Sequence, residues 1–86
     1  MWWVYIVECS DKSLYTGITT DIDRRITEHN TSIKGAKYTR SKRPVFLVYK
    51  ECCENRSIAS KREYQIKKLK RDDKLLLVSK HNMGDI

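Results

Sequence analysis

Five side chains of this sequence are of the types that enzymes use to move protons, bind oxyanions or hold a cation. They are Tyr5, Tyr15, Arg25, His29 and Glu63. Phenols and imidazoles exchange protons, a guanidinium donates hydrogen bonds to phosphate or carboxylate oxygens, and a carboxylate binds hard divalent metal ions. Each residue alone also has a structural explanation, because tyrosines in strands are more often packing residues than catalytic ones. Whether the five residues form one functional site depends on the helices and strands that carry them.

The two tyrosines lie in segments that predict a β-hairpin. Residues 2–9 are apolar almost throughout and rich in β-branched and aromatic types, which indicates a strand covered on both faces. A cluster of turn-forming residues follows at 10–13, and residues 14–19 regain β character.

The length of the hairpin loop decides whether Tyr5 and Tyr15 can share a site. If the loop is Asp11–Ser13, so that Ser10 opposes Leu14, both phenols point to the same face of the sheet. A loop with an even number of residues would place them on opposite faces. A shared site therefore predicts an odd-numbered loop.

A helix is predicted after the hairpin, from a cap at Thr20 or Asp21 to about Asn30. At about 100° per residue, His29 falls between the two isoleucines of this segment, and Arg25 lies about 60° to one side. The adjacent arginine falls on the opposite face. Of the two arginines, Arg25 is therefore the one able to reach across the sheet.

Residues 31–43 form a basic loop that holds five positive charges, one aromatic residue and no acid, and Pro44 closes it. A third strand is expected over Val45–Glu51. The proline stands just before this strand, where its missing N–H removes no ladder hydrogen bond.

A second long helix is predicted from a cap at Asn55 or Ser57 to about Arg71. Glu63 lies at the edge of its apolar stripe. Arg62 falls nearer the middle of the stripe, a position that the sequence does not explain.

The rest of the chain predicts one more short helix, around residues 75–78, and then a frayed end. We expect a single domain over residues 1–80 and a tail over residues 81–86. The element order β-β-α-β-α-α predicts an α+β fold, in which helices flank a three-stranded antiparallel sheet.

Composition favours an anionic partner. The 86 residues include 18 Lys and Arg against 11 Asp and Glu, a formal net charge of +7, which suits nucleic acid or an acidic membrane surface. Three cysteines, Cys9, Cys52 and Cys53, are an odd number and suit reduced thiols in a cytoplasmic protein. The N-terminal segment lacks a basic signal-peptide region and no apolar run approaches about 20 residues, so we expect neither secretion nor membrane spanning.

These residues form an ordered series that resembles the signature of the GIY-YIG nucleases. The series spans residue 2 to about residue 70, and it most resembles the small single-domain bacterial branch, whose members are mostly uncharacterised. That branch is similar to the nuclease subunit of a eukaryotic structure-specific endonuclease. The matching segments are Trp3–Tyr5, Tyr15–Gly17, residues 21–29, Gly35–Arg40, Arg43–Pro44 and Ser60–Leu69.

The resemblance implies hydrolysis of a phosphodiester bond with one bound divalent metal ion. Glu63 would hold the metal, and Mg²⁺ or Mn²⁺ suits one carboxylate with waters and a phosphate oxygen. Arg25 matches the family arginine and would bind the same phosphate. Tyr5 or Tyr15 would position or deprotonate the attacking water, and His29 would share the proton transfer.

Two positions depart from patterns seen in parts of the family. Some relatives carry an asparagine about a dozen residues beyond the glutamate, where this chain has Leu75. Excision-repair relatives carry a lysine shortly after the second tyrosine motif, where this chain has Ile18.

The resemblance implies an endonuclease for which DNA is favoured over RNA as the substrate, with branched, nicked or flapped structures in repair or recombination as candidates. Its specificity would come from a partner protein or from a second copy of the chain. Residues of the basic loop would contact phosphates, and its tyrosine would stack on an exposed base. These residues are Lys34, Lys37, Tyr38, Arg40, Lys42 and Arg43.

Two other functional classes remain open from the sequence. One is a nucleic-acid-binding module that keeps the nuclease fold without turnover, for which salt-sensitive binding without cleavage is expected. The other is an adaptor that docks on a partner protein through Trp2 or the Cys52–Cys53 region.

Overall fold

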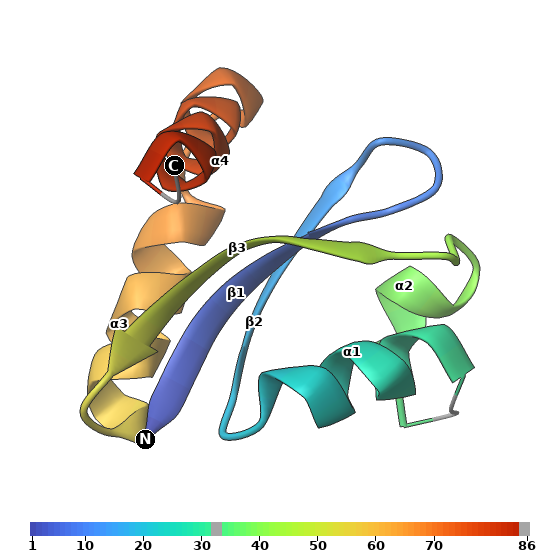
Figure 1. Cartoon of the computed structure of the whole chain (residues 1–86), viewed down its shortest axis with the longest axis horizontal. Helices are drawn as coiled ribbons and strands as arrows, with labels where there is room; N and C mark the ends of the chain where they lie inside the picture. Colours follow the sequence, from blue (N-terminus) through green and yellow to red (C-terminus); the bar gives the residue numbers. More distant parts are fainter. Residues whose placement is uncertain (32–33, 85–86) are drawn as a thin grey trace.

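Three strands form one antiparallel sheet, in the order β2-β1-β3, and helices pack against both of its faces (Figure 1). The computed structural model describes residues 1–31 and 34–84. The predicted α+β fold is confirmed, and the one-turn helix α2, inside the basic loop, is an addition to it. The elements are β1 (Trp2–Glu8), β2 (Leu14–Thr19), α1 (Ile22–Thr31), α2 (Lys37–Arg40), β3 (Phe46–Cys53), α3 (Arg56–Lys67) and α4 (Arg71–Gly84).

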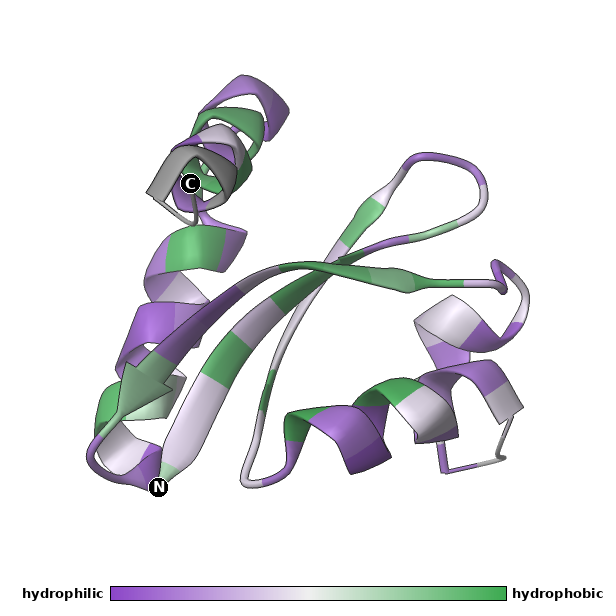
Figure 2. Ribbon diagram, viewed as in Figure 1, coloured by the Kyte–Doolittle hydropathy of each residue, from purple (hydrophilic) through white to green (hydrophobic). Residues whose placement is uncertain are grey.

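The central strand β1 contributes to two hydrophobic cores, because successive side chains of a strand point to opposite faces. Val4 and Ile6 pack on one face with residues of α3 and α4. Tyr5 and Val7 pack on the other face, against α1. Figure 2 shows that the hydrophobic residues of α1 lie on the side turned towards the strands, whereas its outer side is hydrophilic. The prediction of a strand covered on both faces is confirmed.

The hairpin places the two candidate tyrosines on one face of the sheet. Val7 of β1 pairs with Tyr15 of β2, and Tyr5 pairs with Gly17. Because cross-strand partners share a face and every second residue of a strand returns to it, both phenols project from the same face. The prediction of an odd-numbered loop is therefore confirmed.

The predicted register of the hairpin is wrong, because Leu14 does not oppose Ser10. The backbone N–H of Cys9 donates to the carbonyl of Ser13 at 2.8 Å, which leaves three residues in the turn. The last of them, Lys12, has a φ of 71°. A left-handed residue at this position closes a three-residue hairpin loop, so the turn begins one residue earlier than predicted.

Side chains cap both long helices, as predicted. The Asp21 carboxylate accepts the N–H of Arg24 at 3.0 Å, and the Asn55 side-chain oxygen accepts the N–H of Ile58 at 2.9 Å. These N–H groups have no partner within their own helix, so each cap stabilises its helix by about 1 kcal/mol. Of the two candidates at each start, the acid and the asparagine are the ones used.

The two C-terminal helices divide differently from the prediction. Helix α3 stops at Lys67 instead of about Arg71, and α4 then runs to Gly84, well beyond the short segment expected around 75–78. No proline or glycine marks the break. The signal for a new helix is the pair of aspartates in the first turn of α4, whose charge stabilises a helix N-terminus. No helix in the described part of the chain combines the length and the apolar character needed to cross a membrane.

The end of α1 is tied to the beginning of β3 by Asn30. Its amide donates to the carbonyl of Val45 at 3.1 Å and accepts the N–H of Val45 at 2.8 Å, as a neighbouring strand would. The strand then runs from Phe46 to Cys53, two residues past its predicted end, because Cys53 still pairs with Trp2 of β1.

Candidate active site

The phenol of Tyr5 lies across Gly17 of the neighbouring strand β2. A Cβ atom at position 17 would stand 2.5 Å from the Tyr5 oxygen and 2.7 Å from its ring atom Cζ. Any side chain other than hydrogen would therefore collide with the ring. The glycine lets a tyrosine that is only 1% exposed extend towards the β2 edge of the sheet.

His29 of α1 is fully buried and meets the Tyr5 hydroxyl. The Nε2 atom of the imidazole lies 2.7 Å from the Tyr5 oxygen. The ring of Tyr15 packs edge-on against the same imidazole, with 5.4 Å between the ring centroids. The fold thus brings three of the five candidates together, the two tyrosines of the hairpin and the histidine of the first helix.

Arg25 lies near enough to the Tyr5 hydroxyl to lower the pKa of this phenol, whereas Arg24 is exposed, as the helical rotation predicts. The guanidinium also donates to the Glu28 carboxylate at 3.1 Å and to the carbonyl of Lys34 at 2.7 Å. With 24% of its side chain exposed, Arg25 is oriented by protein acceptors and still open to an incoming oxyanion.

The pKa values of the cluster favour neutral groups. Burial raises the pKa of Tyr5 to about 12, against the lowering effect of Arg25. Burial, followed by the charge of Arg25, lowers the pKa of His29 to about 4. At neutral pH the pair is therefore a phenol bonded to an uncharged imidazole. A phenol with this pKa gives up its own proton, as it must before its oxygen can accept another, only when a further cation lowers its pKa.

Glu63 stands on α3, which packs against β1 and β2 on the face of the sheet opposite α1. Its charge is the smallest of the influences on the pKa of Tyr5, and no direct contact joins it to the tyrosine cluster among the described residues. The carboxylate is 24% exposed and forms an ion pair of 3.3 Å with Lys67, one helical turn away. Any metal ion at Glu63 would have to displace this lysine.

Tyr38 of α2 lies against the hairpin. Its ring stacks on that of Tyr15 with 5.9 Å between centroids, and the Lys42 ammonium lies 3.8 Å from the centre of the Tyr38 ring. The same ammonium forms an ion pair of 3.4 Å with Asp11 in the hairpin turn. The predicted base-stacking residue is 43% exposed, so part of its ring remains accessible beside Tyr15.

The other predicted nucleic-acid contacts divide into two groups. The side chains of Lys34, Lys37 and Arg40 are exposed. Arg43, in contrast, is half-buried, and its guanidinium donates to carbonyl groups near the C-terminal end of α1. Arg43 thus binds a helix end, where a cation is favourable.

Sequence reasoning missed Thr39, which is fully buried in α2. Its hydroxyl oxygen lies 2.9 Å from Nδ1 of His29, on the side of the imidazole opposite Tyr5. A threonine in a polar loop has no periodic pattern that would reveal its burial, so no sequence signal indicated this contact.

The position of Arg62, which the sequence did not explain, follows from a partner on β3. Its Nε atom lies 3.1 and 3.2 Å from the two carboxylate oxygens of Glu51, which also accepts the hydroxyl of Tyr49 at 2.6 Å. This polar group joins the sheet to α3 on the face away from the tyrosine cluster. It stabilises the fold and takes no part in the candidate site.

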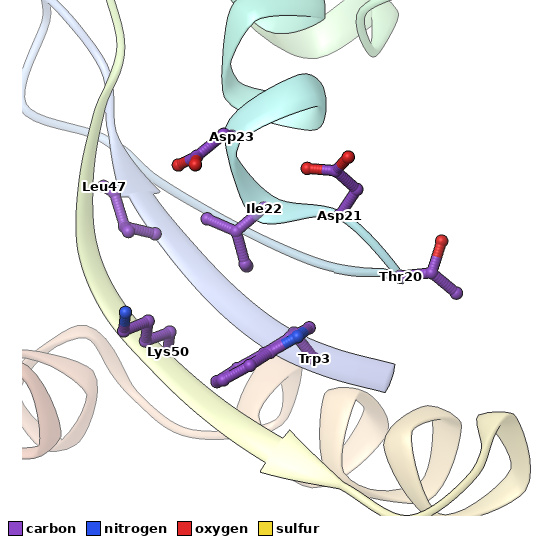
Figure 3. Close-up of a pocket in the computed structure, with 7 residues that line it drawn as sticks. All are labelled: Trp3, Thr20, Asp21, Ile22, Asp23, Leu47 and Lys50. Atoms are coloured by element: carbon purple, nitrogen blue, oxygen red, sulfur yellow. The ribbon is translucent and has the colours of Figure 1, made fainter. Parts of the chain in front are cut away.

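The hollow drawn in Figure 3 lies between the start of α1 and strand β3, and it shares no residue with the five candidates. The ammonium of Lys50 lies 5.6 Å from the Trp3 ring within it, and two carboxylates line its rim. Acidic groups at the rim disfavour a phosphate. The lining residues are Trp3, Thr20, Asp21, Ile22, Asp23, Leu47 and Lys50.

Two carboxylates lie on the elements of the candidate site, Glu63 on α3 and Glu28 on α1, and the Glu28 carboxylate is already bound by Arg25. Over residues 1–31 and 34–84, no group of three or more His, Cys, Asp and Glu side chains is placed to hold a cation. Mg²⁺ usually keeps several waters and binds through one or two carboxylates with substrate phosphates. The Glu63 carboxylate therefore suits a hard divalent ion whose other ligands are waters and a substrate phosphate.

Comparison with known proteins agrees with this geometry. A UPF0213 protein of Desulfotalea psychrophila is 64% identical over 83 residues, which cover 96% of this chain and 76% of that protein. A UPF0213 protein of Haloquadratum walsbyi is 58% identical over 72 residues, or 84% of this chain and 80% of that protein. The solution NMR structure of a UPF0213 protein from Bacillus halodurans has a TM-score of 0.59 at 50% identity, covering 92% of this chain and 84% of its own.

A second solution NMR structure, of a protein from E. faecalis, has a TM-score of 0.62 at 41% identity and covers 94% of this chain and 85% of its own. The family model described as the GIY-YIG catalytic domain matches residues 1–76, which include all five candidate residues. With tyrosines on two paired strands, arginine and histidine on the following helix and glutamate on α3, the chain belongs to the GIY-YIG family, among its UPF0213 members.

Proposed function

We propose that this protein is a divalent-metal-dependent endonuclease that hydrolyses phosphodiester bonds in DNA. The observation that carries the proposal is the contact of 2.7 Å between the Tyr5 hydroxyl and Nε2 of His29, with Arg25 and Glu63 acting on the same phenol. A neutral imidazole bonded to a phenol is an arrangement that moves a proton. In addition, the Arg25 guanidinium can bind a phosphate oxygen, and the Glu63 carboxylate can bind a cation that accompanies the phosphate.

In this proposal the side chains divide the work by their chemistry. Arg25 binds a non-bridging phosphate oxygen and orients it. Tyr5 passes its proton to Nε2 of His29 as it accepts one from the attacking water, so the imidazole becomes charged only while the reaction proceeds. Tyr15, edge-on to the same imidazole, limits water access to it. The hydroxyl of Tyr15 is a second candidate for orienting the water.

Glu63 would hold Mg²⁺ or Mn²⁺ after Lys67 turns away. A divalent ion held there would supply positive charge to stabilise the negative charge on the phosphate and the leaving oxygen. It also supplies the positive charge that a phenol with a pKa of about 12 needs before it can lose its proton. The metal requirement and the raised pKa of Tyr5 are therefore parts of one explanation.

DNA is the proposed substrate because the exposed cations lie beside the candidate site. Lys34, Lys37 and Arg40 are exposed on the segment that also carries Tyr38, next to Tyr15. Cations of this kind bind the phosphate backbone without reading sequence. We therefore propose that the shape of the DNA, as in flaps, nicks and junctions of repair or recombination, determines where it is cut.

The test is a cleavage panel with duplex, single-stranded, flap and four-way-junction DNA, in Mg²⁺, in Mn²⁺ and in EDTA. Glu63→Gln keeps the shape of the side chain and removes its charge, and we expect it to lose cleavage. Glu54→Gln, at an exposed glutamate just before α3, is the matched control and should cleave like the unaltered protein. Equal cleavage by both variants would contradict the assignment of Glu63.

A second function is favoured by one specific observation. The ion pair of 3.3 Å between Glu63 and Lys67 already neutralises the proposed metal ligand. If this pair persists on DNA, the protein is a nucleic-acid-binding module without turnover. It would then bind the same DNA panel in a salt-sensitive way and cleave none of it with any divalent ion.

A further inference from the structure

The basic loop between α1 and β3 folds back so that Thr39 meets His29 from the side opposite Tyr5. Gly35 makes this approach possible, since a Cβ atom there would stand 2.7 Å from the carbonyl oxygen of Glu28 and 2.9 Å from Cα of His29. Thr39 is fully buried, and its hydroxyl lies 2.9 Å from Nδ1 of His29. The same hydroxyl lies 2.9 Å from the carbonyl of Ala36 and can donate to it.

The hydrogen atoms available to these groups separate the two forms of the neutral imidazole. A hydroxyl has one hydrogen to donate. If Nδ1 carries the proton, it donates to Thr39, Thr39 donates to the Ala36 carbonyl, and Tyr5 donates to Nε2. Each of these side-chain groups then has a donor matched to an acceptor.

The other form leaves a group unmatched. If Nε2 carries the proton, it donates to the Tyr5 oxygen, and the Tyr5 hydrogen finds no acceptor among the described residues. In this form Nδ1 can accept from the Thr39 hydroxyl, which then no longer donates to the Ala36 carbonyl, or from the backbone N–H of Ala36, which lies 3.4 Å away, at the long end of the range for a hydrogen bond. A buried hydroxyl hydrogen without an acceptor costs about 1–3 kcal/mol, more than so long a bond provides.

We propose that Thr39 is a positioning residue that holds His29 as the Nδ1–H tautomer, so that Nε2 is free to accept the proton of Tyr5. Thr39 acts through the imidazole and does not touch the substrate. Its importance for cleavage rests on the proposed function, whereas the tautomer is a property of the protein alone. Without the hydroxyl, the N–H of Ala36 becomes the neighbour of Nδ1 and favours the Nε2–H form.

The tautomer can be measured by NMR on the ¹⁵N-labelled full chain at pH 7, through the two-bond correlations between ring hydrogens and ring nitrogens. The chain has two histidines, and His81→Gln simplifies the spectrum. We expect the Nδ1–H pattern for the unaltered protein and for Thr39→Ser, which keeps the hydroxyl. For Thr39→Val, which keeps the shape and loses the hydroxyl, we expect the pattern to move towards Nε2–H.

Three results overturn the proposal: an Nε2–H pattern in the unaltered protein, an Nδ1–H pattern retained in Thr39→Val, or its loss in Thr39→Ser. The patterns of the unaltered protein and of Thr39→Ser test the proposal even if the valine variant does not fold. Cleavage is then compared among the same proteins. With a wrong tautomer, kcat should fall about 100-fold in Thr39→Val with KM unchanged, and recover in Thr39→Ser.

The two readouts separate failure of this proposal from failure of the proposed function. If the unaltered protein cleaves no DNA while the NMR patterns appear as expected, the endonuclease function is wrong and the tautomer assignment stands. If Thr39→Val changes the NMR pattern and cleaves at the normal rate, the positioning role is wrong and the endonuclease function stands.

Discussion

Replacing Gly17 by alanine should destabilise the protein through one identifiable collision. The added methyl group would stand 2.5 Å from the Tyr5 oxygen and 2.7 Å from Cζ, about 1 Å closer than normal contact. The ring is buried against α1, so it must swing away and lose its contact of 2.7 Å with His29.

The expected magnitude follows from two costs and one gain. Overpacking a core costs about 1–3 kcal/mol. A hydrogen bond lost between buried groups costs about another 1–3 kcal/mol. The gain from replacing glycine within a strand is about 0.5–1 kcal/mol, which leaves a net loss of about 1–5 kcal/mol, centred on about 3 kcal/mol. For a domain of this size the melting temperature should fall by about 10–25 °C.

Urea unfolding followed by circular dichroism measures the loss as a lower midpoint at unchanged slope. The control is the same substitution in a Tyr5→Leu background, because leucine lacks the ring atoms that collide. There Gly17→Ala should cost about nothing or stabilise slightly. If alanine is as destabilising beside Leu as beside Tyr, the collision with the phenol is not the reason for the glycine.

Three other predictions test separate parts of the structure. Asn30→Ala removes both hydrogen bonds to Val45 and should lower the free energy of unfolding, measured by urea denaturation, by about 2–3 kcal/mol. A change under about 0.5 kcal/mol would show that these two hydrogen bonds contribute little to stability. Burial holds the pKa of His29 at about 4, below its unfolded value, so the free energy of unfolding should be highest above about pH 6.5 and fall by up to about 3 kcal/mol towards pH 4. In His29→Gln this fall should be smaller, and a variant with the same pH profile as the unaltered protein would contradict the role of His29. Lys67→Ala frees Glu63, so Mn²⁺ should bind more tightly by calorimetry than to the unaltered protein; weaker or equal binding would show that the lysine does not compete.

The sequence predicted the parts of the site that depend on regular periodicity. Two-residue alternation put Tyr5 and Tyr15 on one face once the loop was odd-numbered, and the helical rotation separated Arg25 from its exposed neighbour. The aspartate and asparagine caps followed from residue type. Each of these predictions needed only one element at a time.

The parts that the sequence could not predict depend on contacts between elements. The hairpin register shifts because Lys12 adopts a left-handed conformation that lysine rarely takes. Thr39 and Gly35 both contact residues of α1, which lies earlier in the chain, and Arg62 pairs with Glu51 on β3. No local pattern encodes such pairs, so they appear only when the chain is folded.

The burial of Tyr5 and His29 has a consequence for how this family changes over time. Both residues belong to the packing that joins α1 to the sheet, so a descendant that lost cleavage would still need them in order to fold. Glu63, which is partly exposed and forms its ion pair with the surface residue Lys67, is under no such packing constraint. Relatives that have become inactive should therefore keep the tyrosine strands and lose the glutamate first. The residue at the position of Glu63, rather than the motif that names the family, should then distinguish active from inactive members.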